Sequence, residues 1–142
     1  MDFIKAINHF YFETSIQELR LMHQERILPG ISYNSLLYLD VISYKPNCTI
    51  STLADLLGLT KSAITLKVNE LVKQGFLTKS QSQSDKRVYY LSLSKEAKEV
   101  YEHYDYMLDK AYRLVRQNYS EEDIRKFSEM LNLVSGIYEE NL

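Results

Sequence analysis

The stretch of residues 49–93 constrains the fold more than any other part of the 142-residue chain. Residues 49–57 have the amphipathic pattern of a short helix, and residues 61–74 have the pattern of a second one. Between them, Gly58 supplies the backbone freedom that a sharp turn needs, and Thr60 is a natural N-cap for the second helix. Two helices joined by so short a turn predict a helix-turn-helix.

The ends of these helices are predicted by residue type. Ser51 or Thr52 is available as the N-cap of the first helix, and Gly75 fits the C-terminal cap of the second. Leu59 follows the turn and is expected to fill the corner between the helices from inside. Residues 48–50 are expected to add a short strand beside the hairpin that follows.

The second helix has two different faces. Apolar residues at helical spacing, from Ile64 to Val72, form the face that is expected to hold the core. The other face carries small polar and basic groups, as a helix that enters a DNA major groove does. The candidate DNA-contacting residues of this helix are Lys61, Ser62, Thr65, Leu66, Asn69 and Lys73.

Two extended runs, residues 76–81 and 87–93, predict a two-stranded wing after the helix-turn-helix. The second run alternates apolar and polar residues, which is typical of a half-buried strand. The residues between the runs are polar and lack apolar anchors, so they are expected to form a loose hairpin tip. Lys86 and Arg87 are expected to reach phosphate or the minor groove from this wing, with Asp85 orienting Arg87.

The charge of the chain is unevenly distributed. The formal net charge is −2, yet residues 61–98 hold eight Lys or Arg against three Asp or Glu, a local charge of +5. The rest of the chain then carries −7. Because the positive charge coincides with the predicted helix and wing, it favours a phosphate-binding surface over a merely solvated one.

Long apolar-faced helices are expected on both sides of this region. A first helix over residues 2–28 ends before Pro29, and a second covers residues 33–44. Another begins after Ser94, and the last begins after Ser120. The apolar faces of the first and last helices are broader than a winged-helix core needs. Pairing of two subunits accounts for them better than an accessory layer in a monomer does.

The overall composition excludes several classes of protein. No apolar run approaches the roughly 18 residues of a membrane span, and the N-terminus lacks the order of a signal peptide. With Cys48 as the one cysteine, an intrachain disulfide is excluded, and a cytoplasmic location is expected. No grouping of Ser, His and Asp or of Cys and His adjoins a glycine-rich turn, so neither an enzyme nor a cofactor is expected.

Several short motifs of the central region occur together. They are Leu53-Ala54, Gly58-Leu59, Ser62-Ala63-Ile64-Thr65, Leu71-Val72-Lys73-Gln74-Gly75-Phe76 and Asp85-Lys86-Arg87. In this order they resemble the winged-helix region of MarR-type transcriptional regulators. The Asp-x-Arg just before the second wing strand is the most specific of them. The order of the surrounding elements fits as well, so the resemblance covers essentially the whole chain.

The resemblance implies a mainly α (α+β) fold in which the whole chain, residues 1–142, forms one MarR-like unit. Residues 32–93 would be the winged helix-turn-helix that binds double-stranded DNA. Residues 1–28 and 95–142 would be the dimerisation helices, which interlock in a homodimer. Such a dimer would bind a pseudo-palindromic operator, and repression is the expected mode of regulation. Leu66 stands where many members have Arg, which leaves the operator sequence open.

The resemblance also implies three signals that such a protein could sense: a small ligand, zinc or an oxidant. Many members bind small aromatic or anionic ligands in a crevice, and some sense zinc or oxidants. His23 with Glu25 and His103 with Glu102 could meet, but without an i, i+4 His pair no metal is expected. Cys48 is expected to be a buried, inert residue. The tyrosines near the presumed crevice are Tyr11, Tyr33, Tyr38, Tyr101, Tyr104 and Tyr112.

A different class of function also fits the winged helix. Its basic face could dock an acidic protein partner instead of DNA. Salt-sensitive binding to duplex DNA would favour the regulator, and capture of a protein partner would favour the interaction module.

Overall fold

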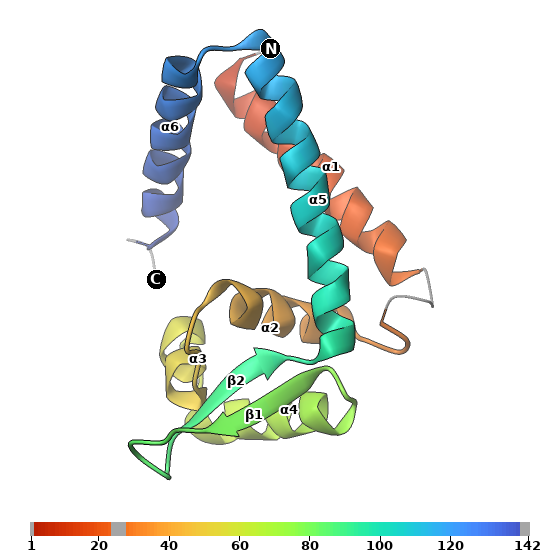
Figure 1. Ribbon diagram of the computed structural model, residues 1–142, viewed down its shortest axis with the longest axis vertical. Coiled ribbons are helices and arrows are strands. Elements are labelled where there is room, and N and C mark those ends of the chain that lie inside the picture. The colour runs from red at the N-terminus through yellow and green to blue at the C-terminus, as the bar shows by residue number, and fades with distance from the viewer. Residues whose placement is uncertain (1, 24–27, 140–142) are drawn as a thin grey trace. The chain divides into compact units, whose positions relative to one another are not determined.

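The computed structural model describes residues 2–23 and 28–139, apart from the side chains of Leu21 and His103. Within these residues the chain forms six helices and one two-stranded antiparallel sheet (Figure 1). The chain divides into two compact units, residues 1–101 and residues 102–142. In chain order the elements are α1 (Phe3–Met22), α2 (Tyr33–Tyr44), α3 (Ile50–Leu57), α4 (Lys61–Lys73), β1 (Leu77–Gln81), β2 (Tyr89–Leu93), α5 (Lys95–Asn118) and α6 (Glu121–Glu139).

The winged helix-turn-helix predicted from the sequence is confirmed. In the first unit, α2, α3, α4 and the β1–β2 hairpin enclose one hydrophobic core. The apolar face predicted for residues 61–74 is the face of α4 that is buried. The largest side chains that are completely enclosed are Leu39, Leu53, Ile64, Leu71, Val68 and Cys48.

The first helix of the motif begins earlier than its predicted cap. Thr49, and not Ser51 or Thr52, is the N-cap of α3, because its Oγ1 accepts a hydrogen bond from the backbone N–H of Thr52 at 3.1 Å. Thr49 has the extended backbone that a capping residue needs, whereas Ser51 and Thr52 already lie inside the helix. Because Thr49, Ser51 and Thr52 all carry a hydroxyl group, the sequence alone did not decide which of them is the N-cap.

The turn between α3 and α4 has the backbone conformation that the sequence predicts, but one of its side chains packs differently. Gly58 has a left-handed backbone with φ of 62°, and Thr60 caps α4 by accepting from the N–H of Ala63 at 3.2 Å. Leu59 is 46% exposed, so the prediction that it fills the corner from inside is wrong. Leu53 and Ala54 supply the buried apolar surface of this corner from α3.

The end of α4 passes directly into the hairpin. Gly75 has φ of 81°, its N–H donates to the carbonyl of Val72, and the N–H of Phe76 donates to the carbonyl of Leu71. This pair of bonds is a Schellman motif, which uses the last free carbonyls of the helix. It turns the chain so that Phe76 is buried and β1 can begin at Leu77.

The hairpin is anchored to the start of α3. β1 and β2 pair with Leu77 opposite Leu93 and Gln81 opposite Tyr89. The strand expected at residues 48–50 is reduced to one bridge between Thr49 and Tyr90, because α3 begins at the next residue. A hydrogen bond of 2.8 Å from the N–H of Leu91 to the carbonyl of residue 48 completes the attachment.

The helices that flank the winged region begin close to the predicted positions, but the first one ends earlier than predicted. α1 ends at Met22 and not at residue 28, since residues 23 and 28 are not helical; residues 24–27 lie outside the described part of the chain. Ser32 caps α2 by accepting from the N–H of Ser35, and Ser94 caps α5 by accepting from the N–H of Ala97 at 3.1 Å. None of the helices in the described ranges is long and apolar enough to cross a membrane.

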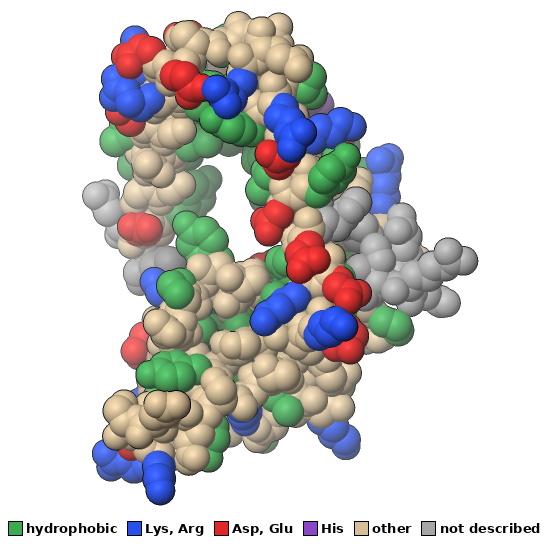
Figure 2. Space-filling model, in the orientation of Figure 1, with side chains coloured by type: hydrophobic (Ala, Val, Ile, Leu, Met, Phe, Trp, Pro, Cys, Tyr) green, Lys and Arg blue, Asp and Glu red, His purple; other side chains and the backbone are tan. Residues whose placement is uncertain are grey.

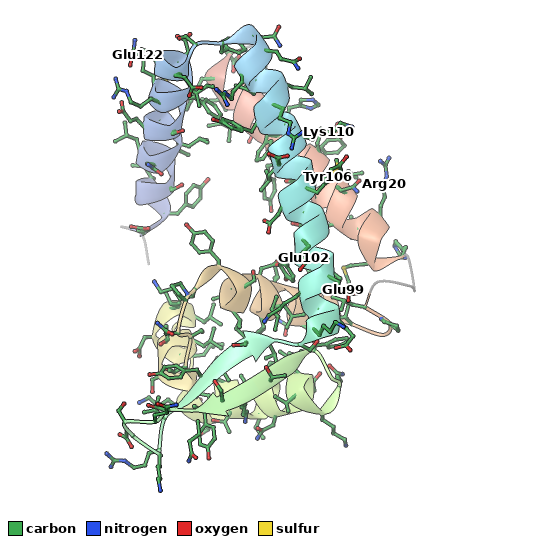
Figure 3. All side chains as sticks on the ribbon, in the orientation of Figure 1. Arg20, Glu99, Glu102, Tyr106, Lys110 and Glu122 are labelled. Atoms are coloured by element: carbon green, nitrogen blue, oxygen red, sulfur yellow. The ribbon has the colours of Figure 1, made fainter. Side chains whose placement is uncertain are left out.

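The second unit contains the rest of α5 and all of α6. Ser120 and Asp123 form a reciprocal cap at the start of α6, since each accepts a hydrogen bond from the backbone N–H of the other. Glu122, labelled in Figure 3, pairs with Arg125 at 2.8 Å. Within residues 121–139 no side chain is buried, and large apolar side chains of α6 are exposed. They are Phe127, Met130, Leu131, Leu133, Ile137 and Tyr138.

Candidate nucleic-acid interface

The candidate interface consists of the polar face of α4 together with the β1–β2 hairpin. We define the polar face of α4 as Lys61, Ser62, Leu66, Asn69 and Lys73, all of which are exposed, with the partly buried Thr65 at its border. Because the opposite face of the same helix is buried in the core, this face points toward solvent. All six residues predicted from the sequence for this helix are therefore brought together on one surface.

Thr65 presents a hydrogen-bond acceptor and a methyl group. Its Oγ1 donates to the backbone carbonyl of Lys61 at 2.7 Å, which uses the one proton of the hydroxyl inside the helix. The oxygen lone pairs remain, and these can accept from the amino group of adenine or cytosine in a major groove.

Leu66 is the one large apolar side chain of α4 that is exposed, at 73%. A lone apolar side chain on a polar helix face can be covered by a thymine methyl group but offers no hydrogen bond to a base. Lys67, its neighbour, pairs at 3.2 Å with Glu70, which lies three residues further along the helix. Its charge is therefore partly neutralised.

Asn69 is connected to the hairpin by a residue that sequence reasoning did not include in the site. The Nζ of Lys79 in β1 donates to the Oδ1 of Asn69 at 2.6 Å. Lys79 lies in the extended run predicted for residues 76–81, but nothing in the sequence indicated its partner. The hydrogen bond exists because the hairpin folds back onto α4, which places residues ten positions apart side by side.

The tip of the wing is ordered by its own hydrogen bonds, so the prediction of a loose segment is wrong. Ser82 is buried, and its Oγ accepts from the backbone N–H groups of Ser84 and Asp85, each at 3.3 Å. The backbone of Ser82 donates to Val88 at 2.9 Å, and Val88 donates to Asp85 at 2.9 Å. The sequence did not predict this order, because the residues between the two predicted strands are all polar. The hydroxyl group of Ser82 orders the tip in place of a buried apolar side chain.

Asp85 holds Arg87 as the sequence predicted. Its Oδ1 accepts from the backbone N–H of Arg87 at 3.0 Å and from Nε at 3.2 Å, and its Oδ2 accepts from Nη2 at 3.2 Å. These hydrogen bonds lower the pKa of Asp85 below its ordinary value, so the carboxylate is charged at neutral pH. The Arg87 side chain is nevertheless 90% exposed and can reach a second partner.

Lys86 completes the basic tip. The Nε2 of Gln81 donates to the carbonyl of Lys86 at 2.6 Å and to the hydroxyl of Tyr89 at 3.1 Å, which fixes the backbone beneath the exposed Lys86 side chain. Figure 2 shows Lys and Arg side chains standing out from the end of the winged region at which the hairpin tip lies. Phosphate groups would meet positive charge there.

The tyrosines expected to line a ligand crevice lie partly beside carboxylates. The hydroxyl of Tyr101 donates to Oδ1 of Asp40 at 2.5 Å, and Tyr33 hydrogen-bonds to Glu18. Burial raises the pKa of Asp40; burial and then the charge of Asp40 raise the pKa of Glu18. An anionic ligand placed here would therefore meet two carboxyl groups.

The candidate sensing residues are described only in part. Glu25 and the side chain of His103 lie outside the described residues, and among those described no three His, Cys, Asp or Glu side chains could hold a metal ion. Cys48 is completely buried, and burial raises the pKa of its thiol despite the nearby charge of Lys45. A raised pKa lowers the thiolate fraction on which oxidation depends.

Comparison with known proteins identifies the fold and a family model that matches part of the chain. The model of the MarR family matches residues 31–89. A search of curated protein sequences gives no match.

Three solved structures illustrate the shared fold. Streptococcus pneumoniae FabT in complex with DNA is 21% identical, with 98% of this chain and 99% of that chain covered and a TM-score of 0.61. The adhesin competence repressor AdcR from Streptococcus pyogenes is 22% identical over 98% and 99% of the two chains, with a TM-score of 0.58. Transcriptional regulator Tm0710 from Thermotoga maritima is 22% identical over 99% and 96%, also with a TM-score of 0.58.

At these identities the solved structures establish the fold alone, and it extends over nearly the whole chain. The family match covers the helix-turn-helix and the hairpin tip, which are the elements that carry the polar face of α4 and the Asp85–Arg87 pair. Residues 31–89 of this chain are thus similar to the MarR family, and the fold is a winged helix-turn-helix.

Proposed function

We propose that this protein is a transcriptional regulator, a repressor, that binds a pseudo-palindromic operator as a homodimer. The observation that carries the proposal is the arrangement of one surface. The polar face of α4 lies beside a hairpin tip on which Asp85 holds the exposed guanidinium of Arg87. A protruding helix and a basic wing match the major groove and the adjoining backbone of duplex DNA.

In this proposal α4 enters the major groove. Ser62, Thr65, Leu66 and Asn69 face base edges, while Lys61 and Lys73 bind the flanking phosphates. The negative net charge of the chain does not oppose this, because residues 61–93, which include α4 and the wing, hold six Lys or Arg against two Asp or Glu. The relative FabT has been crystallised in complex with DNA, and the same mode of binding is proposed for this chain.

The wing supplies the second point of attachment. Arg87 reaches the minor groove next to the major-groove site, and Lys86 binds phosphate. Asp85 contributes by holding the guanidinium in one orientation before DNA arrives, which reduces the side-chain entropy that binding costs. Narrow A·T-rich minor grooves attract such an arginine most strongly.

Dimerisation is proposed through residues 1–28 and 95–142, with residues 32–93 as the DNA-binding region. This proposal is supported by apolar side chains that are exposed in the described part of the chain. On α1, Phe3, Phe10 and Tyr11 are exposed, and on α6 the exposed residues include Phe127 and Leu133. Exposed apolar surface of this extent marks an interaction surface. A two-fold dimer would present two copies of α4 to two half-sites.

Release of DNA by a small molecule is a further part of the proposal. Tyr33 and Tyr101 offer rings beside Glu18 and Asp40, which supports an aromatic ligand better than an anionic one.

Binding to duplex DNA across a salt series tests the proposal. The logarithm of the affinity should fall linearly with the logarithm of the salt concentration, because binding to phosphates releases counterions. Affinity for the operator should exceed that for a scrambled duplex at every salt concentration. If the protein binds no duplex at low salt but captures an acidic protein, the winged helix is a protein-interaction module instead.

A further inference from the structure

We propose that Lys79 and Asn69 act as one hydrogen-bond-donating unit that reads guanine in the major groove, an inference that rests on the proposed DNA-binding function. Lys79 belongs to the wing strand β1 and Asn69 to the polar face of α4. Their side chains meet at 2.6 Å, and both residues are exposed. The unit is therefore accessible to a base from the side on which α4 would meet DNA.

The chemistry of this hydrogen bond fixes the orientation of the Asn69 amide. An ammonium group has three donors and no acceptor, so the atom of Asn69 that faces Nζ must be the carbonyl oxygen. The two amide protons of Nδ2 remain, as do the other ammonium protons of Lys79. Toward a ligand, the unit offers hydrogen-bond donors, and the amide oxygen lies beside a positive charge.

This donor arrangement distinguishes between bases. Free asparagine pairs with adenine by accepting from N6 and donating to N7, which requires an available amide oxygen. With Lys79 on that oxygen, the amino group of adenine or cytosine would approach a positive charge. Guanine presents two acceptors, N7 and O6, to the major groove, and these match two donors. The unit is thus suited to the base that an arginine would read.

The unit also supplies a contact that the exposed apolar residue of α4 cannot make. Leu66 offers no hydrogen bond to a base, so it cannot pair with guanine. Leu66 lies three residues before Asn69, on the same exposed face. We therefore expect each half-site to contain a thymine that Leu66 covers and a nearby guanine that Lys79 and Asn69 read.

The test is base preference at every position of the half-site, measured with the full-length protein and operator duplexes in which one base pair at a time is changed. The wild type should prefer guanine at one position by roughly 5- to 150-fold, the range of one base-specific pair. Lys79→Met should abolish this preference and raise the relative affinity for adenine there, because the Asn69 oxygen becomes available. Asn69→Ala should abolish the preference at the same position, and the double variant should reduce it no further than either single variant.

Lys73→Met is the matched control, since it removes an exposed lysine from the same surface. It should weaken binding to all duplexes without changing base preference, and it should lower the salt slope by about one for each phosphate that Lys73 neutralises. The inference is overturned if Lys79→Met behaves like Lys73→Met, if the two single variants affect different positions, or if the wild type prefers no guanine. If the wild type binds no duplex at all, the proposed function itself fails.

Discussion

Replacing Arg87 by alanine should separate the contribution of the wing from that of α4. The Arg87 side chain is 90% exposed and already donates two side-chain hydrogen bonds to Asp85, so it meets DNA with little further ordering. An arginine that contacts bases contributes about 1–3 kcal/mol to the binding free energy, and a two-fold dimer has two such arginines. Arg87→Ala should therefore reduce the affinity of the dimer by about 2–6 kcal/mol, or roughly 30-fold to 20,000-fold.

Part of this reduction comes from the carboxylate that remains. Arg87 keeps the pKa of Asp85 low, and without that arginine an unpaired negative charge would face the phosphates. Adding Asp85→Ala to Arg87→Ala should then recover some affinity on every duplex. Asp85→Ala alone should instead reduce the preference for A·T-rich flanks, because the guanidinium is no longer held in a fixed orientation.

Fluorescence anisotropy with operator duplexes that carry A·T-rich or G·C-rich flanks measures both effects. Arg87→Lys is the control, since it keeps the charge but removes the planar fork. It should retain the salt slope and abolish the preference for A·T flanks. If Arg87→Ala binds like the wild type on all duplexes, the wing is not a DNA-binding element and the reasoning is refuted.

Substitutions at three further positions test the fold and the suspected sensors. Gly75→Ala should lower the free energy of unfolding by about 1–2 kcal/mol, because φ is 81° there, and Gly75→Asn should cost less; chemical denaturation measures both. Asp40→Asn should stabilise the protein at pH 7 and not at pH 4, seen by thermal melts. Burial raises the pKa of Asp40 in the folded state, so the stability of the wild type falls as pH rises through that pKa. Cys48→Ser should leave DNA affinity unchanged before and after mild peroxide treatment, since burial raises the pKa of the thiol; protection by the substitution would mark Cys48 as a sensor.

Features governed by local rules were predictable from the sequence. The caps at Ser32, Thr60 and Ser94 and the left-handed glycines at positions 58 and 75 each depend on a few adjacent residues. The two faces of α4 follow from helical spacing, and the Asp85–Arg87 pair spans only two positions. Most of the candidate interface could therefore be assigned before the structure was known.

Features that depend on folding across the motif could not be assigned in this way. The pairing of Lys79 with Asn69 requires the hairpin to fold back onto α4, and sequence distance gives no indication of it. Ser82 resembles any loop serine until its hydroxyl is seen to accept two backbone N–H groups. Thr49 was missed as a cap because its neighbours include other hydroxyl residues, and the bridge to Tyr90 helps decide between them.

The most direct test of the central claim is to isolate the genomic DNA that the purified protein enriches and to determine its footprint and the mass of the complex. We predict enriched fragments with two inverted half-sites whose centres lie about 10 base pairs apart, both protected on one face of the duplex. The bound protein should have about twice the chain mass of 16.7 kDa. Enrichment no greater than background, or protection of a single half-site by one chain, would contradict the account.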